Sequence, residues 1–126
     1  MRAALLEKNQ QPLSLVDDVD IADPGPGEVL VKVTHCGICH SDLTVVDMPG
    51  GGQLPCVLGH EAAGVVEEVG SAVTRLVKGD RVMLTPLPTC GACYYCSRNQ
   101  PSLCVEGQTF MTGTRADGTS PLSRAG

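Results

Sequence analysis

The sequence contains very few aromatic side chains: two Tyr, one Phe and no Trp among 126 residues. Proteins that stack nucleic-acid bases rely on such rings, so this composition argues against that function. The core must instead be built from Val, Leu, Ile and Ala, which suits a sheet of β-branched residues. A chain of this length forms one domain at most and can bury a single core.

Clustered positive charge and long apolar runs are also missing. The net charge is −5, and the nine Lys and Arg are scattered singly. Because no basic stripe could follow a phosphate backbone, we do not expect nucleic acid as a partner. No apolar run approaches the length that crosses a membrane, so no membrane partner is expected. The N-terminal residues turn acidic at Glu7, too early for a signal peptide.

Cysteine is the one reactive residue type that is abundant, with seven in the chain. In a cytoplasmic protein, which we expect here, such thiols bind metal more often than they form a disulfide framework, and the odd count agrees with that. After Pro86 the sequence is rich in Pro, Gly and Cys as far as Cys104, with little apolar periodicity. This lobe therefore lacks a core of its own and needs something else to hold it.

The apolar pattern predicts a mainly β fold with one short helix. Val29, Val31 and Val33 alternate with other side chains, as in a strand that has two different faces. The segment Gly25-Pro26-Gly27 precedes that strand and lacks a later Gly, so it is not a dinucleotide-binding loop. The expected helix covers residues 36–46, and the expected strands cover residues 3–7, 13–18, 28–34, 62–69 and 81–84.

The strongest metal signal is a C-x2-C-x2-C-x7-C pattern formed by Cys90, Cys93, Cys96 and Cys104. Zinc in closed structural sites prefers four such thiolates in a tetrahedron, so the spacing predicts a structural zinc site. An iron–sulfur cluster is the sharpest alternative, but those motifs continue with a shorter spacing and a Cys-Pro pair. Disulfides or free thiols are the remaining alternative.

A second C-x2-C pattern, Cys36 and Cys39, is weaker in isolation. It could form a redox pair, or a zinc ribbon with the first two cysteines of the later lobe. The ribbon would leave the last two cysteines of that lobe without a role, so it explains fewer residues. For Cys36 and Cys56 the favoured interpretation is that they are small, buried, unreactive side chains.

Four motifs in order identify a family. The segment Cys36-Gly37-Ile38-Cys39-His40-Ser41-Asp42 is followed by Gly59-His60-Glu61, by Gly79-Asp80-Arg81-Val82 and by the four-cysteine lobe. This order resembles the medium-chain zinc-dependent alcohol dehydrogenases, and the resemblance extends from residue 1 to about residue 104. It implies a GroES-like β-barrel with a Cys-rich zinc lobe and a short helix, here truncated.

The resemblance also implies two zinc sites. Cys39 and His60 match two of the three protein ligands of the catalytic zinc. Glu61 matches an acidic neighbour that can approach the metal when ligands exchange, and Asp42 matches the carboxylate that orients the ligand His. The structural zinc would be held by Cys90, Cys93, Cys96 and Cys104.

The same resemblance implies an oxidoreductase acting on a small alcohol or aldehyde. In the full-length protein an alkoxide on zinc would donate hydride to NAD or NADP. Ser41 matches the hydroxyl that passes the substrate proton onward, and His40 matches a residue that lies near the cofactor pyrophosphate.

Two parts of the family pattern are missing from the chain. The third catalytic ligand is usually a Cys well beyond Cys104, and no Cys follows it here. The Rossmann domain that binds the cofactor is also absent. We therefore expect residues 1–126 to be the N-terminal part of the GroES-like domain of a longer, homo-oligomeric dehydrogenase, and to be inactive alone. A free-standing zinc or interaction module is the alternative, but it would not need Cys39, His60 and Glu61.

Overall fold

The computed structural model describes residues 1–50, 53–87, 89–107, 113–115 and 117–124. Strands dominate, as the apolar pattern predicted. The elements in chain order are β1 (Ala3–Leu6), β2 (Ser14–Val16), β3 (Val19–Ile21), β4 (Val29–Cys36), α1 (His40–Asp47), β5 (Cys56–Val57), β6 (Ala62–Val69), β7 (Arg81–Met83), the 3-10 turns η1 (Cys96–Arg98) and η2 (Pro101–Leu103), and β8 (Leu122–Arg124).

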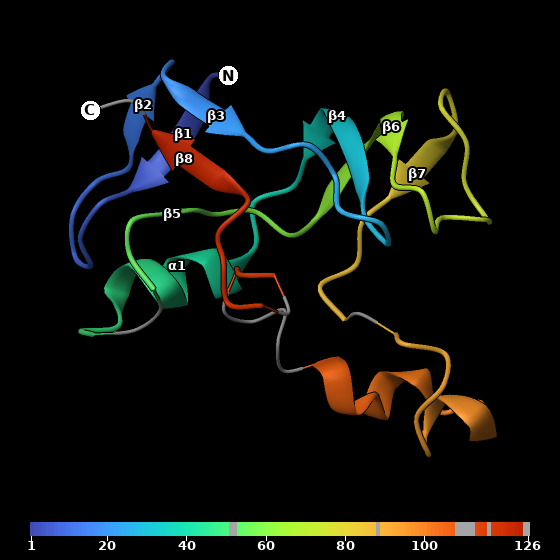
Figure 1. The fold of residues 1–126 in the computed structure, drawn as a ribbon. Helices are drawn as coiled ribbons and strands as arrows, with labels where there is room; N and C mark the ends of the chain where they lie inside the picture. Colours follow the sequence, from blue (N-terminus) through green and yellow to red (C-terminus); the bar gives the residue numbers. More distant parts are fainter. Residues whose placement is uncertain (51–52, 88, 108–112, 116, 125–126) are drawn as a thin grey trace.

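Three small antiparallel sheets make up the body of the molecule. Their strand orders are β2-β1-β5, β3-β8 and β4-β6-β7. The first two sheets lie at one end of the body with α1 below them, and the third lies at the other end (Figure 1). Among the described residues, no helix combines the length and apolar character that crossing a bilayer requires.

The core is small and aliphatic. Leu6, Val19 and Val66 expose 0%, 3% and 1% of their surface. In β6, buried residues alternate with more exposed ones over residues 62–67. The alternation was predicted for residues 28–34 instead, but β4 has no fully buried residue and is exposed from Lys32 onward. A side chain at Gly64 would collide with the carbonyl oxygen of Lys32, so β4 and β6 can pair this closely only with Gly at that position.

Two expected elements differ from the structure. The strand predicted over residues 13–18 is shorter in the structure, because the chain bends at Asp17 directly after β2, and the strand β3 that follows was not predicted and pairs in a different sheet. The helix begins at His40 instead of residue 36, because β4 continues to Cys36 and pairs with Ala62 of β6.

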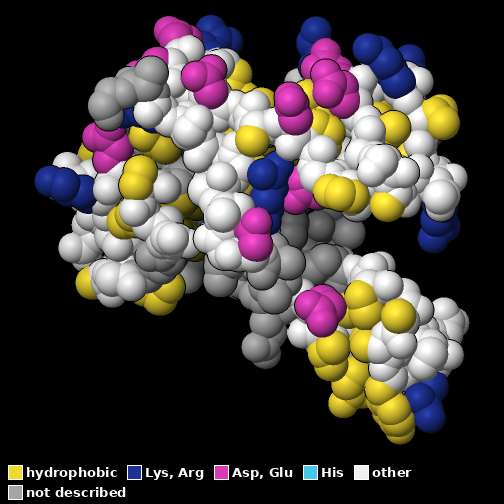
Figure 2. All heavy atoms as spheres, in the orientation of Figure 1, with side chains coloured by type: hydrophobic (Ala, Val, Ile, Leu, Met, Phe, Trp, Pro, Cys, Tyr) yellow, Lys and Arg dark blue, Asp and Glu magenta, His cyan; other side chains and the backbone are white. Residues whose placement is uncertain are grey.

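The lobe formed by residues 89–107 projects from the body (orange in Figure 1). Cys104 is its one buried side chain, whereas Tyr94, Leu103 and Val105 are more than half exposed. Figure 2 shows hydrophobic side chains gathered on the surface of this lobe. The prediction that the lobe has almost no core of its own is confirmed.

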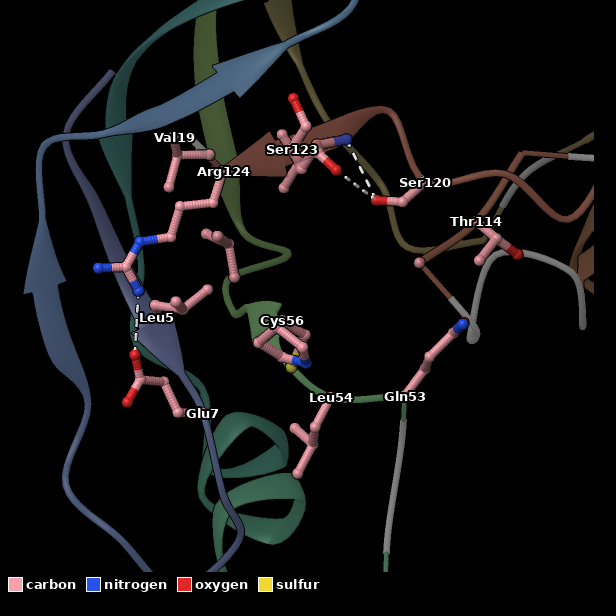
Figure 3. A pocket seen from close by; sticks show the side chains of 14 residues that line it. Leu5, Glu7, Val19, Gln53, Leu54, Cys56, Thr114, Ser120, Ser123 and Arg124 are labelled. Carbon is pink, nitrogen blue, oxygen red and sulfur yellow. Dashed lines mark hydrogen bonds and ion pairs between the residues drawn. The ribbon is translucent and has the colours of Figure 1, made fainter. Parts of the chain in front are cut away.

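A cavity of about 550 Å³ opens between β1, β5 and β8 (Figure 3). An ion pair between Glu7 and Arg124, 3.1 Å long, borders it. Cys56 also lines the cavity, and burial raises the pKa of its thiol. The described lining includes none of the predicted metal ligands, so the cavity is separate from the sites below.

Candidate metal centres

The four cysteines of the lobe converge on one point. The sulfur atoms of Cys90, Cys93, Cys96 and Cys104 all lie within 4.8 Å of one another. A zinc tetrahedron with Zn–S bonds of about 2.3 Å separates its sulfurs by about 3.8 Å, so sulfurs gathered this closely fit a zinc ion. Gly91 has a φ of 74°, a left-handed conformation that Gly adopts without strain and that turns the chain between the first two cysteines.

Backbone N–H groups point at these sulfurs. The N–H of Cys90 donates to the sulfur of Cys104, and the N–H of Cys93 donates to the sulfur of Cys90, both at 3.3 Å. The N–H groups of Cys96 and Val105 lower the pKa of Cys93 to about 6. Desolvation and the neighbouring thiols raise the pKa of Cys96 to about 12. The N–H of Cys90 likewise lowers the pKa of Cys104, so backbone donors favour the thiolate form at two of the four sulfurs.

The second centre forms where β4 ends and β6 begins. The last pair of the β4–β6 ladder is Cys36 with Ala62, and the N–H of Gly37 donates to the carbonyl of Glu61 at 3.0 Å. This pairing brings the loop that leads into α1 against the segment before β6. As a result, Cys39, His60 and Glu61 each place one possible ligand atom within 4.8 Å of the other two.

Asp42 connects both halves of this centre. Its Oδ1 lies 3.2 Å from Nδ1 of His60, and its Oδ2 accepts the backbone N–H of Cys39 at 3.1 Å. The Asp42 side chain is only 15% exposed, and that of His60 is 25% exposed. A carboxylate on Nδ1 fixes the orientation of an imidazole and leaves Nε2 for a ligand, as at many metal sites.

The surroundings of Cys39 and His60 shift the pKa of each side chain toward its charged form. The backbone N–H of Ser41, the Ser41 hydroxyl and His60 together lower the pKa of Cys39. The contact with Cys39, followed by the charge of Asp42, raises the pKa of His60. The Cys39 thiol donates to Oγ of Ser41 at 3.6 Å. A thiolate, an imidazole and a carboxylate form a donor set of the kind that binds catalytic zinc.

Comparison with known proteins assigns the family. Residues 25–121 match the sequence profile of the alcohol dehydrogenase GroES-like domain. The chain belongs to this family.

Individual relatives agree with that assignment. The chain is 43% identical to the S-(hydroxymethyl)glutathione dehydrogenase of Synechocystis sp., over 99% of this chain and 34% of that protein. It is 39% identical to the NDMA-dependent alcohol dehydrogenase of Amycolatopsis methanolica, over 99% of this chain and 33% of that protein. The crystal structure of an alcohol dehydrogenase zinc-binding domain protein from Burkholderia ambifaria superposes with a TM-score of 0.91 at 40% identity, covering 98% of this chain and 33% of that one. This chain thus spans about a third of the length of the relatives that it matches.

The fold of this alcohol dehydrogenase domain confirms the expected GroES-like β architecture with a Cys-rich lobe. Of the predicted site residues, it brings together Cys39, His60, Glu61 and Asp42 in one place and the four lobe cysteines in another. Ser41 lies beside the first centre. His40 is exposed at the first position of α1 and is not among the clustered ligands.

One interpretation of the cysteines was wrong, and an alternative that the sequence already disfavoured is excluded. Cys36 is exposed instead of buried, because it ends a strand whose last residues face solvent. The zinc ribbon is also contradicted, since among the described residues Cys90 clusters with the other lobe cysteines and not with Cys36 or Cys39. Cys56 is half-buried, which partly agrees with the prediction.

Sequence reasoning missed the part played by Gly37. A Cβ at this position would collide with Oε2 of Glu61 and would come within 3.1 Å of its Cβ. The only sequence signal is a Gly inside the C-x2-C motif, and that signal alone does not reveal which side chain occupies the space.

Proposed function

We propose that the chain is the zinc-bearing part of the catalytic domain of an NAD- or NADP-dependent alcohol or aldehyde oxidoreductase. The convergence of Cys39, His60 and Glu61, held by Asp42, carries this proposal. A purely structural zinc module would need only the four-cysteine lobe, so a second, open donor set favours catalysis.

Each residue of the centre has a proposed role that follows from its position. Cys39 and His60 hold the catalytic zinc, and Asp42 keeps the His60 ring in place. Zinc in such a site acts as a Lewis acid that polarises an alcohol or carbonyl oxygen. The hydroxyl of Ser41, which lies 3.6 Å from the sulfur of Cys39, accepts the substrate proton and passes it toward solvent. His40, exposed at the start of α1, contacts the cofactor pyrophosphate.

The lobe has a structural role in this proposal. Zinc held by Cys90, Cys93, Cys96 and Cys104 replaces the apolar core that the lobe lacks. The exposed surfaces of Tyr94, Leu103 and Val105 agree with a segment that is organised by metal instead of by burial.

We further propose that the remaining functional parts come from outside these 126 residues. They are a third ligand for the catalytic zinc, the Rossmann domain that binds the cofactor, and the contacts of a cytoplasmic homo-oligomer. The coverage of only about a third of the relatives supports this division. Residues 1–126 alone are then inactive, because holding cofactor and substrate together contributes roughly 7–11 kcal/mol to lowering such barriers.

Steady-state kinetics of the intact protein tests the proposal. With a panel of primary alcohols, reduction of NAD or NADP should be measurable, and His60→Ala should lower kcat/KM by at least about a hundredfold. His35→Ala is the matched control, because His35 is exposed on β4 and contacts only Thr34 among the partners described for its ring. An unaffected His60→Ala variant, or turnover by residues 1–126 alone, would show that the proposal is wrong.

A further inference from the structure

Gly37 lies at a point where the catalytic centre has no room for a side chain. Its backbone N–H donates to the carbonyl of Glu61 at 3.0 Å, so the two backbones are tied together. The carboxylate of Glu61 occupies the space that a Cβ on Gly37 would fill. In this position the carboxylate is within 4.8 Å of the ligand atoms of Cys39 and His60.

We propose that Gly37 is a positioning residue, whose missing side chain admits the Glu61 carboxylate to the Cys39–His60 metal site, next to the corner left for the third ligand. The inference rests on the function proposed above. An alanine here would push Oε2 of Glu61 aside through rotation of the Glu61 side chain, and the close approach of its Cβ to that of Glu61 would add a shift of a few tenths of an ångström. That rotation carries the carboxylate away from the thiol and the imidazole.

The structure predicts that this displacement is local. The shortest approach, to Oε2, is to the far end of a flexible, exposed side chain, and the 3.1 Å approach to the Glu61 Cβ requires a shift of only a few tenths of an ångström. Gly37 also does not have the left-handed φ that would disfavour alanine. Gly37→Ala should therefore fold normally and change the metal site through Glu61.

A double-mutant cycle in the intact protein tests the inference. Zinc affinity is measured by chelator competition, following only the portion of bound zinc that is lost in Cys39→Ala. Gly37→Ala and Glu61→Ala should each weaken this zinc about tenfold, and the double variant should be no more than about twofold weaker than Glu61→Ala. Gly27→Ala is the matched control, because Gly27 is exposed and a Cβ there meets no atom within 4 Å.

Each contrary outcome is distinct. Wild-type affinity in Gly37→Ala or in Glu61→Ala overturns the Gly37 inference and leaves the proposed function standing. An equal effect of Gly37→Ala with and without Glu61, or failure of Gly37→Ala to fold while Gly27→Ala folds, shows a general structural role and also overturns it. If Cys39→Ala loses no zinc, the proposed function itself fails.

Discussion

The carboxylate of Asp42 lies 3.2 Å from Nδ1 of His60. The other oxygen of the same carboxylate accepts the backbone N–H of Cys39, which precedes α1. One side chain thus fixes the two candidate zinc ligands relative to each other, although Cys39 follows β4 and His60 precedes β6. The geometry of the centre therefore depends on Asp42 as well as on the ligands.

Removing this carboxylate should loosen the catalytic zinc. Asp42→Ala frees the His60 ring and removes an acceptor from the start of α1, so zinc affinity at this centre should fall about 10- to 100-fold. Zinc in the four-cysteine lobe should be retained. Chelator competition measures both populations, and Asp17→Ala, at an exposed aspartate, is the control. Equal zinc affinity in Asp42→Ala and wild type would contradict the positioning role.

The whole four-cysteine lobe should lose its zinc and its ordered structure when one ligand is removed. Cys96→Ser should lose the lobe zinc, and hydrogen exchange in residues 89–107 should accelerate because no buried core remains to hold them. The control is Cys56→Ser, since Cys56 lines the separate cavity. If Cys96→Ser keeps its full zinc content and its exchange protection, the assignment of the lobe is wrong.

A metal-free lobe that keeps the conformation described above should have an unusually acidic Cys93. Backbone N–H donors lower the pKa of Cys93 to about 6, whereas desolvation and nearby thiols raise that of Cys96 to about 12. The stabilisation from the Cys93 thiolate is present above the ordinary thiol pKa, about 8.5, and is lost as the pH falls through about 6. Alkylation followed by peptide mass spectrometry should show half-maximal Cys93 reactivity near pH 6 and slow reaction of Cys96 at pH 9. Half-maximal reactivity of Cys93 above pH 8 would contradict this.

An ion pair between distant segments should contribute modestly to stability. Nε of Arg115 donates to both carboxylate oxygens of Glu28 at 3.0 and 3.1 Å, and Nη2 donates to the carbonyl of Asp23 at 2.9 Å. Because both side chains are partly exposed, Arg115→Met should lower the free energy of unfolding by only about 1 kcal/mol.

Urea denaturation, with the exposed Arg75→Met as control, measures the Arg115 effect. The N–H of Gly25 and the Arg115 guanidinium lower the pKa of Glu28 below its ordinary 4.5. The Arg115 contribution should therefore be present at neutral pH and lost as the pH falls through that lowered pKa. A loss above about 3 kcal/mol would show that Arg115 does more than pair with Glu28.

Local pattern was sufficient where a short apolar run ends at a turn residue. Strand β6 was predicted with its observed bounds, because residues 62–69 are rich in Val and end before Gly70. Strand β3 was not predicted, because it pairs with β8, more than 100 residues later, and no local signal encodes such a partner. The role of Gly37 was missed for the same reason, because the space beside it is filled by Glu61, which lies 24 residues later in the chain, directly before β6.

The most direct test of two zinc sites with the proposed ligands is anomalous diffraction at the zinc edge from crystals of the intact protein. We predict two peaks: one surrounded by the sulfurs of Cys90, Cys93, Cys96 and Cys104 at about 2.3 Å, and one in contact with the sulfur of Cys39 and the imidazole of His60. A peak at the lobe alone, with no metal between Cys39 and His60 in zinc-saturated crystals, would contradict the account.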